Sequence, residues 1–456
     1  MALVERPKRI IVNKRAERKA QVYIGIDFGT TYTKVSYMIA PSTIRYSIKF
    51  TNSKSGYYKP SVVYVNEQEA EVSFSYFDSS REVKYFKYSM IDSTLLSEET
   101  EGRVLKVPKA RLFSAFYLGC LIRIIKGEIV KNPELSNYSS EPEWYINIGV
   151  PIGNYDETDK IHKNVYNVVL NVGYQFASSS MFSQKINLKI FEEFYVQHEK
   201  DYLSNLNSIS ELYAEILMYH QDNQVPEGFY AIVDVGGGTV DIATFYKYIS
   251  KDYGTEVECI SQKVESLGVE SLINKSANNA DSEEEREQIR EYLIDSTLNY
   301  NNDDYKIHNI DSPYINGHCL YLNRRLFRTA YGTCLMEAKK KQRSLMSAQA
   351  KNKQKLCCFL LGGGKSLQFY SQTIQHMAYA HSKAGFPPEV ITDIKEYINN
   401  NPDLKVKSNR LIISQMLAQP YEKIPPIKDM PWHFDMTEEE RISEEDLPDV
   451  DQLYPK

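Results

Sequence analysis

Short apolar runs separated by turn residues dominate the first part of the chain. β-Branched and aromatic residues concentrate in four segments divided by Gly, Pro, Ser or Asn, namely QVYIGIDFG (21–29), TKVSYMIA (33–40), TIRYSIKF (43–50) and SVVYVN (61–66). Runs of this length and composition predict β-strands joined by hairpins. We therefore expect the fold to begin near Gln21 with a meander of strands.

Helical periodicity follows the strands, and the same order then returns. Apolar residues recur at helical spacing over 111–130 and 157–176, with a buried strand at 144–152 between them. After Phe229 the chain shows strand, turn and strand again, then helices from about Asn274, a long helix over 323–349 and the strand LCCFLLGGG (356–364). This repetition predicts an α/β architecture built twice, with one lobe over 21–228 and a second over 229–418.

The two ends of the chain lack these patterns. The stretch KRIIVNKRAERK (8–19) carries six Lys and Arg, and residues 1–20 are expected to form a basic flexible arm. Residues 419–456 are rich in proline and then in acidic residues, which predicts an irregular tail. The segment 275–312, rich in Asn, Asp and Glu, is expected to be a solvated helix and loop.

Composition excludes several classes of protein. A hydrophobic share of 42% with 25% charged residues is typical of a folded globular chain, and the net charge of -6 gives no reason to expect a nucleic-acid partner. The longest apolar stretch, Leu112 to Ile125, is interrupted by Arg123 and is shorter than the ~20 residues that span a bilayer. The six cysteines form no C-x-x-C pair, which favours reduced thiols and a cytoplasmic location without membrane contact.

An aspartate and a Gly-Thr turn stand at the end of the first apolar strand. In IGIDFGTTYTKVSY, Asp27 ends the strand, and Gly29, Thr30 and Thr31 form the turn into the next one. Glycine lets a phosphate approach the backbone, whose N–H groups and neighbouring hydroxyls can donate to its oxygens. Taken alone, this segment is equally consistent with an ordinary hairpin that has a polar tip.

A second copy of this motif changes that balance. In IVDVGGGTVDIATF, Asp234 ends a strand, residues 236–238 are glycines, and Thr239 and Asp241 follow, 207 residues after the first copy (234 minus 27). Two unrelated hairpins explain such a repeat poorly, so the pair favours phosphate binding. Facing hairpins would bring Asp27 and Asp234 to one Mg²⁺, which prefers a few carboxylates, water and phosphate oxygens.

A third glycine run follows the last predicted strand. In FLLGGGKSLQFY, the glycines 362–364 stand between a buried strand and a predicted helix. They would permit close approach of a flat ring or a ribose to the backbone. On its own the run is more simply explained as a tight turn between a strand and a helix.

In this order the three motifs resemble the phosphate-one, phosphate-two and adenosine motifs of the DnaK-type heat-shock chaperone ATPases, relatives of actin and hexokinase. Four further segments fit that family: PSVVYV (60–65), VKYFKYSMID (83–92), INIGVPIG (146–153) and SELYAEILMY (210–219). The resemblance implies an actin-like fold of two lobes, with duplicated ribonuclease-H-like mixed sheets and helices around them. It also implies ATP or ADP with Mg²⁺ in the cleft between the lobes.

The resemblance assigns roles to individual residues. Asp27 and Asp234 would hold the hydrated Mg²⁺, Lys87 (or Lys84) would approach the terminal phosphate, and Glu211 and Asp241 would orient water. The catalytic set would thus comprise Lys87, Glu211, Asp234 and Asp241. The nucleotide-binding set would comprise Gly29, Thr30, Thr31, Tyr32, Gly236, Gly237, Gly238, Thr239, Gly362, Gly363, Gly364 and Ser366.

The expected function is a nucleotide switch that acts on a protein partner, with slow ATP hydrolysis. Only 39 residues follow Leu417 (456 minus 417), too few for the peptide-binding domain of complete chaperones. A filament-forming actin relative and a regulatory subunit that binds ATP without hydrolysis remain alternatives. A small-molecule kinase is disfavoured, because GGGKSLQFYSQTIQHMAYA lacks the acidic residue those enzymes carry after the late glycines. The preference for adenine or guanine stays open.

Overall fold

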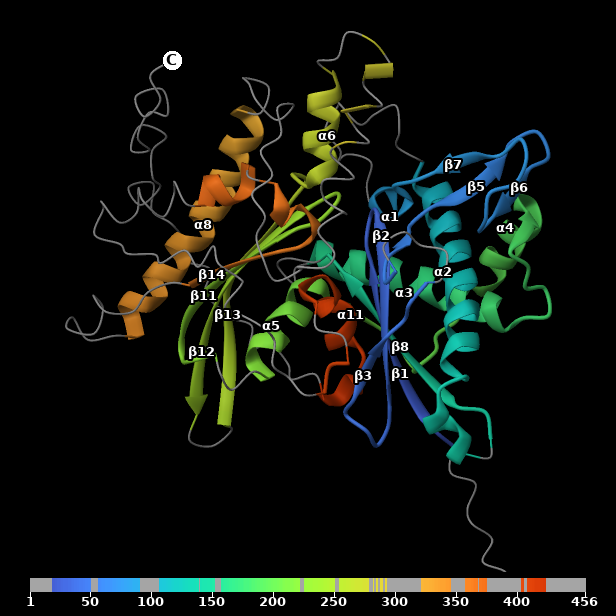
Figure 1. Ribbon diagram of the computed structural model, residues 1–456, viewed down its shortest axis with the longest axis horizontal. Helices are drawn as coiled ribbons and strands as arrows, with labels where there is room; N and C mark the ends of the chain where they lie inside the picture. The colour runs from blue at the N-terminus through green and yellow to red at the C-terminus, as the bar shows by residue number, and fades with distance from the viewer. Residues whose placement is uncertain are drawn as a thin grey trace, which may run out of the picture.

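The computed structural model describes residues 19–50, 56–90, 106–138, 140–151, 157–221, 225–250, 254–278, 282, 284–285, 288–289, 292, 321–345, 357–367, 369–374, 403–405 and 408–423. Over these ranges the chain is a mixed α/β protein with three sheets (Figure 1). Residues 1–18 of the predicted arm, 424–456 of the predicted tail and most of 275–312 lie outside the described residues.

The first sheet is built around β1 (Gln21–Phe28) and has the order β10-β8-β1-β2-β3, with β4 paired to β2. β1 is antiparallel to β2 and parallel to β8, which is parallel to β10. β1 is buried along nearly its whole length, which explains its continuous apolar run. The other strands are β2 (Tyr32–Ile39), β3 (Arg45–Ser47), β4 (Lys59–Pro60), β8 (Glu143–Val150) and β10 (Leu206–Ser210).

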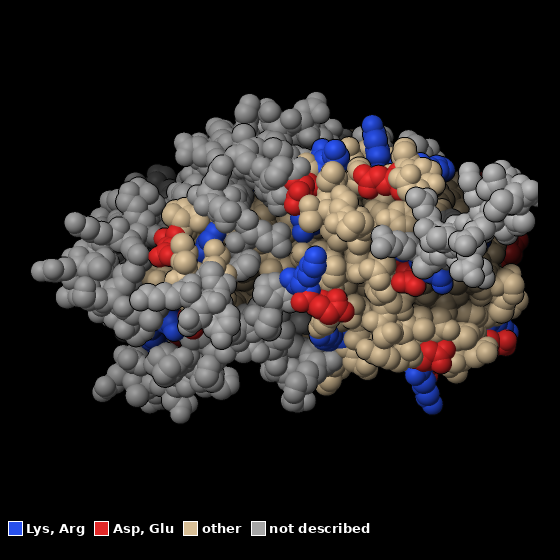
Figure 2. Space-filling view, turned by 90° about the horizontal axis from the view of Figure 1, so that it is seen from below, with Lys and Arg blue, Asp and Glu red and all other residues tan. Residues whose placement is uncertain are grey.

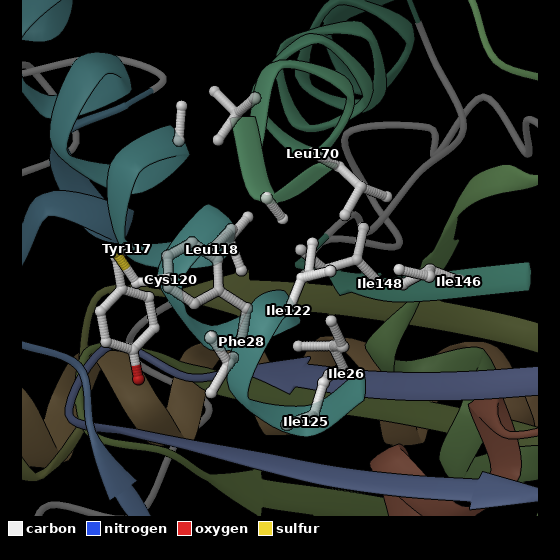
Figure 3. Packing of buried hydrophobic residues seen from close by; sticks show 14 of the residues in the cluster. Ile26, Phe28, Tyr117, Leu118, Cys120, Ile122, Ile125, Ile146, Ile148 and Leu170 are labelled. Carbon is white, nitrogen blue, oxygen red and sulfur yellow. The ribbon is translucent and has the colours of Figure 1, made fainter. Parts of the chain in front are cut away.

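Helices α2 (Val107–Ile129) and α3 (Glu157–Ser178) pack together beside this sheet. A Cβ on Gly119 would lie 3.0 Å from the carbonyl oxygen of Gly173, so the two glycines allow the helices to approach closely. Figure 3 shows Ile122 and other α2 side chains gathered with isoleucines of β1 and β8. α2 begins before the predicted helix because Pro108 occupies its first turn, where a missing N–H costs nothing.

A small antiparallel sheet continues the N-terminal part of the chain. Its order is β7-β5-β6-β9, so the segment 61–66 pairs here and not with the predicted meander. The following short helix α1 (Phe86–Ser89) carries Lys87. The strands are β5 (Val63–Asn66), β6 (Glu71–Ser73), β7 (Arg81–Val83) and β9 (Lys185–Asn187), and β9 leads into α4 (Leu188–His198).

The second sheet repeats the plan of the first. Its order β13-β12-β11-β14 matches β3-β2-β1-β8, and the strand directions match as well. The strands are β11 (Gly228–Val235), β12 (Val240–Ser250), β13 (Gly254–Glu265) and β14 (Cys357–Leu361). The predicted repetition of strands is therefore present in the sheet topology.

Two helices lie between the first and second sheets (Figure 1). α5 (Glu211–Gln221) and α11 (Ile412–Leu417) pack on each other, and α11 also packs on β1, where a Cβ on Gly25 would overlap the carbonyl of Ser414. α6 (Val269–Asn278) follows β13, and α8 (Tyr321–Leu345) packs on β12 and β13. Among the described residues, one hydrophobic core lies on the second sheet, and another is shared by the first sheet and the small sheet. Among the described helices, none combines the length and apolar character needed to cross a membrane.

Candidate functional site

One pocket collects the turns that follow β1, β11 and β14. Its volume is about 1030 Å³, including the part open to solvent. The first turn (29–31) and the second (236–239) are called here the first and second hairpin turns, and 362–364 the third glycine turn. The lining residues are Asp27, Gly29, Thr30, Thr31, Tyr32, Lys34, Tyr58, Lys87, Glu211, Glu215, Asp234, Gly236, Gly237, Gly238, Thr239, Asp241, Val269, Glu270, Ile273, Gly362, Gly363, Gly364, Arg410 and Ile413.

The first hairpin turn is fixed from behind by Ser61. Its hydroxyl donates to the carbonyl of Gly29 at 2.7 Å, and its N–H donates to the carbonyl of Thr31 at 2.9 Å. Asp27 and Lys34 are cross-strand neighbours in β1 and β2, and Lys34 Nζ contacts Asp27 Oδ2 at 2.7 Å. The acid of the first hairpin is therefore already paired with a cation.

The second hairpin turn is held by the start of α6. The N–H of Val269 donates to the carbonyl of Gly236 at 3.0 Å, and that of Glu270 to Gly237 at 2.8 Å. At the position matching Lys34, β12 carries Asp241 opposite Asp234. The two hairpins thus share a shape but differ in charge, since the second pairs two carboxylates.

The three turns contact one another. A Cβ on Gly237 would overlap the hydroxyl of Thr31, so the first and second hairpin turns touch at this point. Gly362 has φ +78, and a Cβ there would overlap Asp234 Oδ1 and the carbonyl of Val235. Only glycine fits that conformation and that space without strain. The third glycine turn therefore packs directly on Asp234, near the end of β11.

Lys87 and Glu211 form a buried ion pair in the pocket. Lys87 Nζ lies 2.8 Å from Glu211 Oε1, and their side chains are only 6% and 10% exposed. Burial lowers the pKa of Lys87, but attraction by Glu211, Tyr166 and Asp27 and the hydrogen bond to Glu211 together outweigh it, so the net shift is upward. Gly149 has no side chain and so leaves room for Glu211, since a Cβ on Gly149 would lie 2.7 Å from Glu211 Cγ. The alternative lysine, Lys84, is paired with Glu82 on the exposed edge of β7 and does not line the pocket.

Three further carboxyl groups are buried beside this pair. Burial raises the pKa of Asp241 well above its usual value, and repulsion by Glu211 and Asp234 adds to the effect. Burial likewise raises the pKa of Glu215, which lies one helical turn after Glu211 and shares a hydrogen bond with Asp234. Burial also raises the pKa of Asp234, with attraction from Lys34 opposing it. These acids are therefore poorly neutralised by the protein alone.

The charges around the pocket favour a cation. Among the described lining residues, the carboxylates Asp27, Glu211, Glu215, Asp234, Asp241 and Glu270 outnumber the cations Lys34, Lys87 and Arg410. Asp241 Oδ1 is buried without a hydrogen-bond partner. Within the described part of the chain, no group of three or more His, Cys, Asp or Glu is arranged as a complete metal site. A divalent ion that keeps several waters, as Mg²⁺ does, needs fewer protein ligands and fits this donor set.

Several lining residues were not predicted from the sequence. Lys34 could have been predicted as a lining residue, because it pairs with Asp27 across the first hairpin as Asp241 pairs with Asp234 across the second. Glu215 could have been found from its helical spacing to Glu211. Nothing in the motifs pointed to Arg410 or Tyr58, which enter from segments distant in the sequence. The side chain of Ser366 lies outside the described residues, although its backbone ends the short 3₁₀ helix Gly363–Ser366.

The sequence matches no protein-family model, and no curated protein matches it.

Proposed function

We propose that the pocket binds ATP or ADP with Mg²⁺, and that the chain is a nucleotide switch of the DnaK type with an actin-like, two-lobed fold. One observation carries the proposal. Three glycine turns, of which the first begins after Asp27 and the last ends at Gly364, meet in a single pocket that also holds the Lys87–Glu211 pair. The repeated strand order of the two sheets supports the proposed fold.

The two hairpin turns would hold the phosphates. Their carbonyls at Gly29, Gly236 and Gly237 already accept hydrogen bonds from protein donors, and backbone N–H groups of such turns are suited to anions. Thr31 Oγ1 is buried without a partner and would donate to a phosphate oxygen. Asp27 and Asp234 would hold the hydrated Mg²⁺. The apolar side chains of Val269, Ile273 and Ile413 offer a surface for the base.

Hydrolysis would depend on positioned charge. Bound Mg²⁺ would neutralise phosphate charge. Lys87 would stabilise the negative charge that develops on the terminal phosphate, and Glu211 or Asp241 would orient the attacking water and accept its proton. The raised pKa of Glu211, caused first by burial, makes this carboxylate a stronger base. Its ion pair with Lys87 opposes that effect, so we expect slow turnover.

The switch would follow from the contact between the hairpin turns. A terminal phosphate bound by both would hold the two sheets together, and its loss would release that link. We propose that a protein partner reads this difference. The free thiols at Cys120, Cys259, Cys334, Cys357 and Cys358 support a cytoplasmic location. On the face seen in Figure 2, described basic and acidic side chains are interspersed, and we propose no nucleic-acid partner.

Phosphate release from Mg-ATP tests this function. We expect steady release by the full chain and none by Asp234→Asn, which removes one charge at the proposed metal position while keeping the side-chain shape. Absence of both binding and release in the unaltered chain would overturn the proposal. Binding without release would show an ATP-sensing subunit, and nucleotide-dependent pelleting would show a filament-forming protein.

A further inference from the structure

Arg410 lies where three parts of the chain meet at the pocket. It belongs to the short 3₁₀ helix Asn409–Leu411, which leads directly into α11. The guanidinium carbon lies 5.0 Å from the ring centre of Tyr58, in a cation–π contact. Its Nη2 would lie 2.5 Å from a Cβ placed on Gly363. Arg410 thus extends from α11 to both the third glycine turn and the strand region beside the first hairpin.

The backbone that carries Arg410 is firmly attached to the first sheet. The hydroxyls of Ser36 and Ser414 lie 3.0 Å apart, and Asn147 Nδ2 donates to the carbonyl of Leu417 at 2.8 Å. The residues of α11 are buried throughout. The position of Arg410 is therefore set by packing and not by chance contacts of a surface side chain.

Arg410 is one of three cationic side chains among the described residues that line the pocket. Lys34 and Lys87 are each engaged by a carboxylate, at 2.7 and 2.8 Å, while the lining acids outnumber the lining cations. A polyphosphate that enters the pocket needs positive partners. A guanidinium has five N–H donors in one plane, so it can stack on Tyr58 through its face and still donate from its edge.

We propose that Arg410 is a further nucleotide-binding residue that donates hydrogen bonds to a phosphate group, an inference that rests on the proposed function of the pocket. Gly363 is then required for space, because a side chain at that position would displace the guanidinium. The contact would also join the nucleotide to the segment 408–423, which packs on the first sheet. Nucleotide binding would thereby be sensed at the N-terminal end of α11.

Equilibrium binding of ADP and of adenosine to the full chain tests this inference. Loss of a charge-assisted hydrogen bond should weaken ADP binding by Arg410→Ala roughly tenfold to a hundredfold and leave adenosine binding unchanged. Arg410→Lys, which keeps the charge but loses the planar group, should give an intermediate loss. Gly363→Ala alone should weaken ADP binding. In the Arg410→Ala background the same substitution should cause little further loss of ADP binding, because both changes act on one contact.

The outcomes separate this inference from the proposed function. Equal losses of ADP and adenosine affinity in Arg410→Ala would show that Arg410 stacks on the base. Unchanged ADP affinity would show that Arg410 contacts no part of the nucleotide. Either result overturns this inference and leaves the proposed function standing. Failure of the unaltered chain to bind ADP or ATP would overturn the proposed function as well. Thermal unfolding of each variant without ligand identifies any loss that comes from unfolding, and Arg410→Lys then decides the question.

Discussion

Removal of Lys87 should expose the energetic cost of the acidic pocket. At the 2.8 Å separation from Glu211, the attraction is about 6 kcal/mol for an effective dielectric constant of 20, most of it offset by the desolvation of both charges. Removing one partner of such a buried pair costs about 3–5 kcal/mol. We therefore expect Lys87→Met to lower the free energy of unfolding by that amount at pH 8. The double variant with Glu211→Gln should recover most of the loss, because the carboxylate that Lys87 had neutralised is then removed as well.

The sign of the pH dependence follows from Glu211. Its pKa in the folded chain is already raised by burial, and loss of Lys87 raises it further. Below its unfolded pKa this carboxyl is protonated in both states, so the penalty disappears there and grows as the pH rises. Urea unfolding at pH 5 and pH 8 measures the difference. Lys131→Met, which breaks an exposed pair with Glu128, serves as the control and should change stability by less than about 1 kcal/mol.

Two results would refute this reasoning. A double variant as unstable as Lys87→Met alone would show that the loss comes from packing around the lysine stem and not from the uncompensated carboxylate. An equal penalty at pH 5 and pH 8 would lead to the same conclusion.

Three further predictions concern the turns, the pocket acids and the contact between its two sides. Gly362→Ala should weaken nucleotide binding and lower stability together, since φ +78 alone costs a non-glycine residue about 1 kcal/mol or more. The control Gly127→Ala on α2, where no atom lies within 4 Å of the added methyl, should not destabilise the chain. Thermal unfolding and nucleotide titration compare the two variants. The raised pKa of Asp241 predicts that its own contribution to stability without ligand is greatest below its unfolded pKa and is lost as the pH rises through the folded one, and that Mg²⁺ with nucleotide reduces this loss. A pH series of melting curves compares the unaltered chain with Asp241→Asn, and a difference between them that does not change with pH would contradict the prediction. The Tyr85 hydroxyl donates a hydrogen bond to Glu270 Oε2 at 2.8 Å and so links α1 to α6. Tyr85→Phe should therefore speed nucleotide dissociation roughly tenfold, measured by stopped flow. The control Tyr64→Phe, which loses only an exposed hydrogen bond to Glu82, should match the unaltered chain.

The sequence predicted best those elements whose pattern is local. β1, β8 and β11 are buried on both faces and read as continuous apolar runs, and the helix predicted over 157–176 is α3. β13 was not predicted, because its sequence GTEVECISQKVE alternates weakly and its side chains are mostly half-buried at a sheet edge. The division of the predicted meander between two sheets also had no local signal, since strand pairing depends on contacts distant in the sequence.

The same distinction applies to the site. The glycine turns are local motifs, and the structure brings all three into one pocket. Glu215 and Lys34 follow from helical spacing and strand register once the elements are known. Arg410 and Tyr58 come from segments 352 residues apart (410 minus 58), and only the packing of α11 on the first sheet places them together. No pattern along the chain could have shown that contact.

The most direct test of the central claim is a calorimetric titration of the full chain with Mg-ADP, beside Asp27→Asn and Asp234→Asn. If both hairpins hold one nucleotide, the unaltered chain should bind one ADP per chain in a Mg²⁺-dependent manner, and each substitution should weaken binding strongly although the two residues lie on different sheets. Full binding by either variant, or no binding by the unaltered chain, would contradict a shared nucleotide site between the two hairpins.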